Sequence, residues 1–123
     1  MNIVDSSGWL SYFASDKNSR TFIDPIEKLE ELLVPSITLT EVFKNILRQR
    51  SEEAALRAIA HMEQGKVVPL NEQLAIDAAY IGVKYKLPLA DSIIYATARQ
   101  YEATIWTQDA DFRDLKNVRY YPK

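Results

Sequence analysis

The chain contains no cysteine, and this absence removes several kinds of site at once. Disulfide bonds, thiolate zinc centres and cysteine nucleophiles are all excluded, and a reducing compartment suits such a chain. We therefore expect a cytoplasmic protein. No basic and then apolar leader precedes Asp5, and no run approaches ~18 apolar residues, so we expect neither a signal peptide nor a membrane span.

Histidine and glycine are nearly as scarce. The single histidine, His61, rules out a two-histidine nuclease and any histidine-rich metal site. The three glycines form neither the G-x-G-x-x-G nor the G-x-x-x-x-G-K pattern of a phosphate-binding loop. Any chemistry on phosphates must therefore rest on other residue types.

What the chain does contain is an ordinary globular composition, with 47% apolar and 26% charged residues. Its 123 residues suit one domain, which we place over residues 1–123. The formal net charge of −2 argues only weakly against a phosphate substrate. Acids that bind a cation no longer contribute their full negative charge.

Short apolar runs alternate with helical patterns along the chain. The runs predict buried parallel strands at 3–4, 32–34, 67–68 and 104–106, with a more polar edge strand at 118–121. Apolar spacings of three and four predict helices near 9–13, 39–47, 55–62, 74–85 and 94–101, and Asp24-Pro25 with Glu27 predicts another helix start. This alternation predicts an α/β three-layer sandwich with a central parallel sheet of about five strands.

Four acids stand where an apolar run gives way to a helical pattern: Asp5, Glu41, Asp91 and Asp109. In open α/β sheets, ligands bind beyond the carboxyl ends of the strands, and Asp5 and Asp109 follow predicted strands closely. Glu41 follows a strand by one loop and a turn, whereas the sequence does not fix the direction of the Asp91 helix.

Gathered at one edge, these carboxylates would need a partner of opposite charge. Two of them 4 Å apart repel by about 4 kcal/mol at an effective dielectric constant near 20, so a cluster must take up protons, spread apart or bind cations. Oxygen ligands without histidine or cysteine favour Mg²⁺ or Mn²⁺ over Zn²⁺. Helix capping is the better explanation of each acid taken singly, since Thr38 and Glu41 have capping-box spacing and aspartate is a good N-cap. Position alone leaves both interpretations open.

The segments around the four acids resemble the PIN-domain ribonucleases, and most closely the VapC-type toxins of toxin–antitoxin pairs. The matching segments are 3–10, 37–43, 87–94 and 106–112, which follow the family's order and spacing over nearly the whole chain. The resemblance implies a PIN-like fold and an Mg²⁺ site formed by Asp5, Glu41, Asp91 and Asp109. It also implies hydrolysis of RNA phosphodiesters by a metal-dependent endoribonuclease.

The resemblance extends to supporting residues and partners. Asp111 matches an additional, usually peripheral acid, and Ser6 and Thr107 match small hydroxyl positions that support the acidic residues. An antitoxin protein that covers the site, and a homodimer, are likewise implied by the resemblance alone.

Other candidate contacts with RNA lie near the acids. Glu41, Asn45 and Arg48 share one face of a predicted helix; we predict that Asn45 supports the acidic site and that Lys44 and Arg48 contact the RNA backbone. A solvated helix face explains the two basic residues slightly better. Tyr95, one turn after Asp91, is predicted to stack on a base or, in the favoured alternative, to pack in the core.

Two other functions remain open. A PIN-like protein without catalysis would act only as a protein-interaction scaffold, and a PIN nuclease can serve RNA processing outside a toxin–antitoxin pair. A phosphatase of the haloacid dehalogenase type is disfavoured, because its second aspartate would fall at Ser7. A rise in melting temperature with Mg²⁺, together with RNA cleavage, distinguishes a nuclease from a scaffold.

Overall fold

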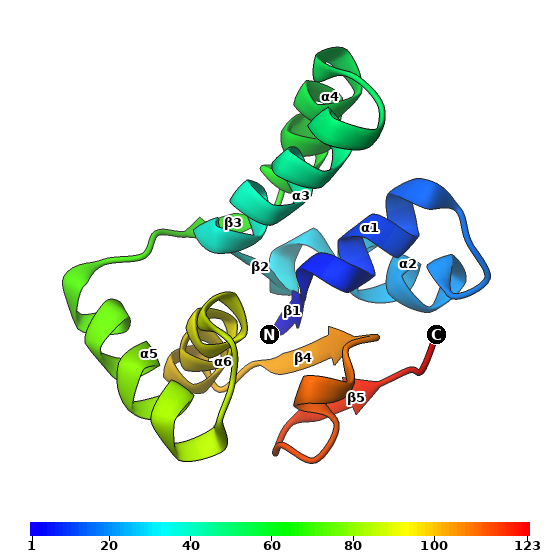
Figure 1. The fold of residues 1–123 in the computed structure, drawn as a ribbon. Helices are drawn as coiled ribbons and strands as arrows, with labels where there is room; N and C mark the ends of the chain where they lie inside the picture. The colour runs from blue at the N-terminus through cyan, green and yellow to red at the C-terminus, as the bar shows by residue number, and fades with distance from the viewer.

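The computed structural model describes all 123 residues and contains one parallel sheet (Figure 1). The strand order is β3-β2-β1-β4-β5, and every neighbouring pair is parallel. The five predicted strands are confirmed, and the most polar of them lies at an edge as expected. Their bounds are Asn2–Val4 (β1), Leu32–Pro35 (β2), Lys66–Val68 (β3), Thr104–Thr107 (β4) and Val118–Tyr120 (β5).

Six α-helices and two 3₁₀ turns connect the strands. None of the helices combines the length and the apolar character that a membrane crossing requires. Their bounds are Ser6–Ala14 (α1), Ser19–Glu27 (α2), Ser36–Gln49 (α3), Glu52–Met62 (α4), Glu72–Tyr85 (α5) and Leu89–Tyr101 (α6), with turns Leu29–Glu31 (η1) and Ala110–Phe112 (η2).

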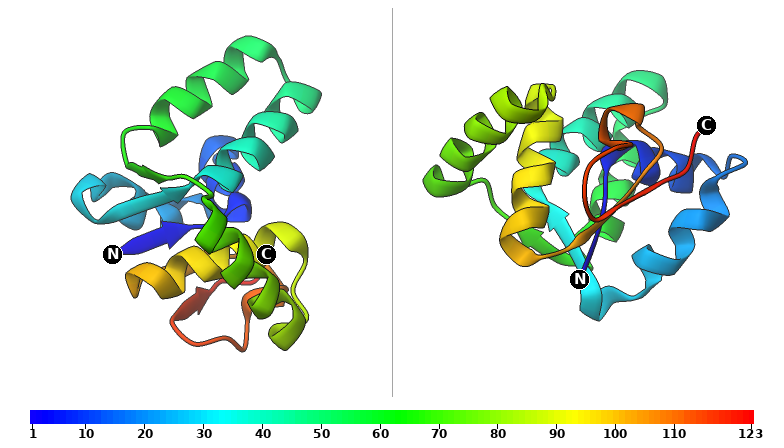
Figure 2. Two further views of the ribbon diagram at one scale, coloured as in Figure 1. Left: turned by 90° about the vertical axis from the view of Figure 1, so that its left-hand side faces the viewer. Right: turned by 90° about the horizontal axis from the view of Figure 1, so that it is seen from below.

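Alternating side chains of the central strands build a core on each face of the sheet. Ile3 and Ile105 are fully buried beneath α5 and α6. Val4 and Trp106, their neighbours in sequence, face the other side, where α1 to α4 supply the remaining apolar residues. The three-layer α/β sandwich is thereby confirmed, and Figures 1 and 2 show α3 and α4 extending together beyond the sheet.

Three predicted helix starts are wrong. Helix α2 begins at Ser19, so Asp24 lies inside it and Pro25 falls near its end. Burial of its apolar face extends the helix toward its N-terminus, and this packing outweighs the one hydrogen bond that proline removes. Thr38 is no capping residue, because its hydroxyl lies within α3 and donates to the Pro35 carbonyl at 2.6 Å. Asp91 is the third residue of α6 and not its N-cap.

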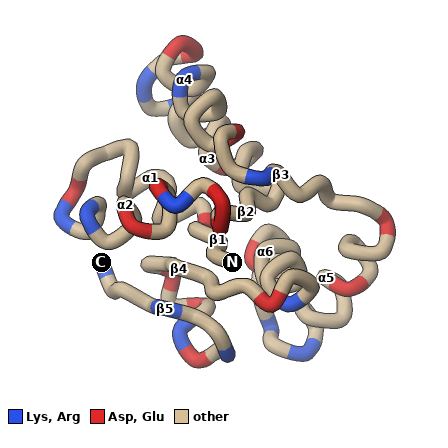
Figure 3. Tube along the Cα trace, turned by 180° about the vertical axis from the view of Figure 1, so that it is seen from behind, with Lys and Arg blue, Asp and Glu red and all other residues tan.

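The direction of α6 follows from where it ends. The Thr104 amide, just after α6, donates to the Met1 carbonyl, so the helix stops at the edge where β1 begins. Its 13 residues span about 20 Å, so its first turn reaches toward the opposite, carboxyl edge of the sheet. Charged residues of both signs lie on the outer helices and loops (Figure 3).

Candidate functional site

The strand order reverses between β1 and β4, which is where open α/β sheets bind their ligands. Asp5 directly follows β1, and Asp109 lies just beyond β4. The first turn of α6 brings Asp91 to the same place, and α3 brings Glu41. All of these acids, with Asp111, are close enough for the other four to act electrostatically on Asp91.

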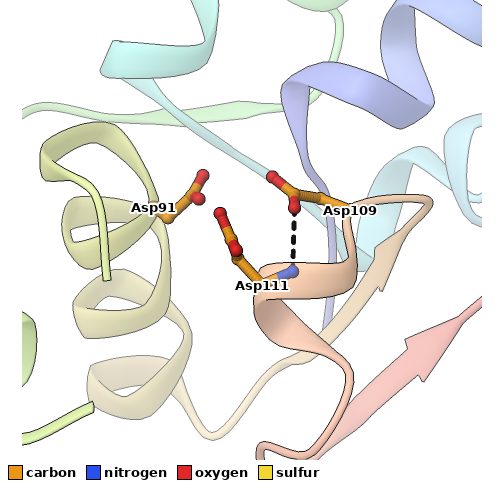
Figure 4. Close-up of side chains that lie close together, drawn as sticks. All are labelled: Asp91, Asp109 and Asp111. Carbon is orange, nitrogen blue, oxygen red and sulfur yellow. Dashed lines mark hydrogen bonds between the residues drawn. The ribbon is translucent and has the colours of Figure 1, made fainter. Parts of the chain in front are cut away.

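The tightest part of the site consists of three aspartates from two segments. One carboxylate oxygen from each of Asp91, Asp109 and Asp111 lies within 4.8 Å of the other two, and the side chains point toward one another (Figure 4). The Asp111 amide donates to Asp109 Oδ1 at 2.9 Å, which fixes the spacing of the η2 pair. Asp111 was predicted to be peripheral, but the 3₁₀ turn rotates its carboxylate into the cluster.

Asp5 has different surroundings, because protein donors satisfy its carboxylate. The side chain is 2% exposed. Its Oδ1 accepts from the Ser7 hydroxyl at 2.8 Å and from the Gly8 amide at 3.0 Å, which caps α1. Its Oδ2 accepts from the Thr107 hydroxyl at 2.6 Å. Asp5 is thus both a helix cap and a member of the acidic site, so the two interpretations of the sequence are compatible.

The predicted supporting hydroxyls contact two of the acids. Thr107 donates to Asp5 and accepts from the Asp109 amide at 2.8 Å, so one buried hydroxyl links the ends of β1 and β4. Ser6 donates to Glu41 Oε1 at 2.5 Å and thereby ties α1 to α3.

Two further supporting residues were missed in the sequence. The Ser7 hydroxyl accepts from the Gln108 amide at 3.1 Å while it donates to Asp5. Gln108, which looks like a variable position in the sequence, is 7% exposed; its side chain donates to the Ser7 carbonyl and accepts from Asn18. A polar residue directly after a buried strand was the available signal.

The electrostatics of the site show where positive charge is missing. Burial raises the pKa of Asp5 to about 6, against the lowering effect of its three hydrogen bonds. Burial also raises the pKa of Asp91, to about 8, and repulsion from Asp109, Asp5, Asp111 and Glu41 adds to the effect. The Asp91 carboxylate accepts no hydrogen bond from the protein. An all-carboxylate donor set of this kind fits a hard divalent cation.

The other predicted residues lie near the site without joining it. Asn45 is half-buried and lines a groove of about 480 Å³ that Ser7 and Gln108 also line, but no hydrogen bond joins it to an acid. Lys44 and Arg48 are exposed on α3. Tyr95 is 4% exposed and its hydroxyl donates to the Lys116 carbonyl, so base stacking by this ring is wrong for this conformation and the packing alternative holds.

The sequence of the chain places this site in a known family. The PIN domain family matches residues 3–118. The chain belongs to the PIN domain family. This confirms the resemblance carried by the four acidic segments, and the PIN fold accounts for the five-stranded parallel sheet. No curated protein matches the chain significantly.

Solved structures share the fold of this PIN domain at low sequence identity. A toxin–antitoxin complex from Klebsiella pneumoniae is 19% identical, covers 100% of both chains and has a TM-score of 0.84. VapC20 of Mycobacterium tuberculosis, a sarcin–ricin loop cleaving toxin, is 19% identical over 99% of this chain and 100% of its own, with a TM-score of 0.81. DNA-bound VapBC from Salmonella typhimurium is 16% identical over 98% and 96% of the two chains, with a TM-score of 0.75.

Proposed function

We propose that this PIN domain is a metal-dependent endoribonuclease and the toxin of a VapBC-type toxin–antitoxin pair. The observation that carries the proposal is the meeting of the Asp91, Asp109 and Asp111 carboxylates within 4.8 Å. Helix capping accounts for Asp5 and Asp109 but not for Asp91, which caps nothing and gains no hydrogen bond. Crowded carboxylates at the switch point of the sheet are therefore best explained by a bound cation.

The donor set suits Mg²⁺, with Mn²⁺ as a substitute, because it offers carboxylate oxygens and neither cysteine nor histidine. Asp5, Asp91 and Asp109, with Asp111, would hold the ion directly or through water. A divalent cation there supplies Lewis acidity, which lowers the pKa of a water and offsets the charge of a scissile phosphate.

The chain's own residues orient this set. The Thr107 hydroxyl holds Asp5 and the Asp109 backbone in a fixed relation. Ser6 binds one oxygen of Glu41 and leaves the second without a protein donor, so Glu41 can complete the acidic shell or orient the attacking water. No side chain of the site need act as the nucleophile.

The toxin assignment is supported by the solved structures of similar fold, which include VapC20 and complexes of toxin with antitoxin. An RNA substrate and a cognate antitoxin that covers the site follow from this likeness as proposals. A PIN nuclease of RNA processing would share the same acidic site and differ only in lacking an antitoxin partner.

We also propose a homodimer, formed through the outward face of α5. Ile76, Tyr80 and Val83 recur at helical spacing on that face and are 53%, 76% and 83% exposed, and the nearby Leu89 is 79% exposed. These side chains present roughly 400–500 Å², the size of patch that is often an interaction site. Two copies would together bury about 1,000 Å², the lower limit of a specific interface.

Charge favours a second copy as the occupant of this face. Glu72 lies at the start of α5 and Lys86 just past its end, both exposed and without an ion pair. Antiparallel pairing of two α5 helices brings Glu72 of each copy toward Lys86 of the other. Tyr80→Glu with Val83→Glu should therefore yield a monomer in sedimentation equilibrium, and an unchanged dimer would place the interface elsewhere.

The central test of the nuclease proposal is incubation of the protein with total cellular RNA, in Mg²⁺ or in EDTA, followed by mapping of the product ends. We expect cleavage in Mg²⁺ only. Asp5→Asn should lose most cleavage and keep the fold, because asparagine caps helices as well as aspartate. Asp24→Asn is the matched control, since this exposed acid on α2 lies outside the cluster. A protein that neither cleaves RNA nor gains melting temperature with Mg²⁺ would be a scaffold.

A further inference from the structure

A second feature of α6, away from the acids, is a groove of about 450 Å³ between this helix, the end of α5 and the segment 114–117. Tyr85 and Tyr95 line it, with ring centroids 5.6 Å apart in an edge-to-face arrangement. The Tyr95 hydroxyl donates to the Lys116 carbonyl at 3.2 Å and so holds segment 114–117 against α6. The groove is therefore a formed feature of the fold with two aromatic side chains in its wall.

Three cations surround this groove, one from each wall: Lys84 of α5, Arg99 of α6 and Lys116 of segment 114–117. None of them takes part in an ion pair. The one acid that lines the groove, Asp114, lies 3.9 Å from Arg113, which lies outside the groove. In a chain with a net charge of −2, the groove thus carries an excess of positive charge.

Tyr85 sets the direction of two of these cations. Arg99 Nη1 donates to the Tyr85 hydroxyl at 3.2 Å. Lys84 Nζ lies 5.3 Å from the centre of the Tyr85 ring, within the range of a cation–π contact. Two flexible side chains are thereby held at one rim, which lowers the entropy that they lose when an anion binds.

The basic groove lies farther along α6 than the acidic site does. Asp91, Tyr95 and Arg99 succeed one another at intervals of four residues, so they lie on one side of the helix. Arg99 lies about 12 Å along the axis from Asp91, and the opposite wall runs from Asp111 in η2 to Lys116. Figure 4 shows α6 and the η2 segment flanking the three acids, and Figure 3 shows basic positions on the ends of α5 and α6 and on the segment before β5.

We propose that the basic groove binds backbone phosphates of the RNA strand on one side of the scissile bond. This inference rests on the proposed nuclease function. A strand whose scissile phosphate lies at the acids would place phosphates a few nucleotides away beside Arg99, Lys84 and Lys116. Contacts of this kind fix the register of the strand and carry no base specificity. The three cations are positioning residues for the substrate.

The test is the salt dependence of binding to a fluorescent single-stranded RNA of about 20 nucleotides, measured by anisotropy in EDTA, so that no metal-dependent cleavage occurs. Each phosphate contact contributes about 0.7 to the slope of log K against log salt for a single strand. The combined variant Lys84→Gln, Arg99→Gln and Lys116→Gln should therefore lower the magnitude of that slope by about 2. All three residues are exposed, so the melting temperature should stay within a few degrees of the wild type.

The matched control removes the same charge from exposed positions outside the groove that take part in no ion pair: Lys17→Gln, Arg20→Gln and Lys66→Gln. We expect its slope to stay near that of the wild type. An equal fall in both variants would show an effect of net charge alone and overturn the proposal. A fall in the control with no change in the groove variant would place the strand outside the groove and overturn the proposal as well.

Cleavage in Mg²⁺ separates this inference from the nuclease proposal. If the chain cleaves RNA, the groove variant should raise KM with little change in kcat, as expected when binding contacts are lost from ground state and transition state alike. If the wild type binds RNA through the groove but never cleaves it, the nuclease proposal fails and the proposal that the groove binds RNA stands. If the groove variant cleaves RNA with an unaltered KM and an unaltered salt slope, the nuclease proposal stands and the proposal that the groove binds RNA is overturned.

Discussion

Asp5 and Asp91 lie in the same acidic site but are held in opposite ways. Asp5 is almost fully buried, and donors from Ser7, Gly8 and Thr107 bind both of its oxygens. Asp91 is less buried and has no protein donor, yet its pKa is raised further, to about 8 against about 6 for Asp5. Hydrogen bonds from the protein thus offset the burial of one acid, whereas the other has only negative neighbours. The α6 side of the site therefore carries the negative charge that no protein donor offsets.

The strongest test of this contrast is Asp91→Asn, which removes the acid that all the others repel. We expect cleavage to fall by roughly two to three orders of magnitude, the usual cost of losing a group that stabilises transition-state charge. The rise in melting temperature with Mg²⁺ should shrink at the same time. Without metal and above pH 8, the variant should be more stable than the wild type, because repulsion is relieved. Differential scanning fluorimetry with EDTA and with Mg²⁺ measures both effects.

On the Asp5 side, Thr107→Val removes the hydroxyl that links Asp5 to the Asp109 amide. Valine has nearly the same shape, so the loss should reflect two buried polar groups without partners, about 1–3 kcal/mol in the free energy of unfolding. Urea denaturation measures this loss. Thr107→Ser is the matched control, since it keeps the hydroxyl, and it should recover most of the stability. A loss in Thr107→Ser as large as that in Thr107→Val would mean that the hydroxyl contributes no more to stability than the methyl group, and it would contradict this prediction.

The pH dependence of stability follows from the raised pKa values of both acids. In the folded protein Asp5 and Asp91 keep their protons above the unfolded value of 3.8. The folded state then binds more protons than the unfolded state, so stability without metal should fall as pH rises from about 4 to 8. Mg²⁺ should counter this fall at the alkaline end, because the ion competes with protons for the same oxygens. A melting temperature in EDTA that does not fall between pH 5 and pH 8 would contradict the raised pKa values of Asp5 and Asp91.

The smallest effect is expected at Ser6, which binds one oxygen of the half-buried Glu41. Ser6→Ala should lower cleavage by less than about tenfold and stability by roughly 1 kcal/mol or less, since Glu41 can turn toward water. Single-turnover cleavage at saturating Mg²⁺ measures the first quantity. A loss of cleavage as large as that of Asp91→Asn would mean that Glu41 must be held rigidly. The contrast between acids with protein donors and Asp91 without them would then fail.

The sequence predicted the fold correctly where a local pattern was compatible with only one arrangement in space. Short β-rich runs at Ile3 and Ile105 could only be buried parallel strands once helices lay between them, and Asp5 and Asp109 then had to share an edge. It failed where tertiary packing decides. The start of α2 depends on burial of Phe22 and Ile26. The position of Asp91 depends on the direction of α6, which the hydrogen bond between Thr104 and Met1 reveals.

The sequence named most of the acids that the structure brings together, but it did not predict their geometry. Asp111 enters the cluster because a 3₁₀ turn follows Asp109, and a turn of three residues leaves little trace in sequence. Gln108 and Ser7 support Asp5 through a hydrogen-bonded chain that only the contact of β1 with β4 creates. Tyr95 shares helical spacing with both the site and the core, so its burial could not be decided from spacing alone.

The arrangement of β4 between β1 and β5 has one more consequence, for the chain during its own synthesis. The segment that carries Asp109 and Asp111 is made about a hundred residues after Asp5, and without it two of the three clustered carboxylates are missing. The complete acidic cluster therefore forms only after β4 and η2 have left the ribosome and β4 has paired with β1.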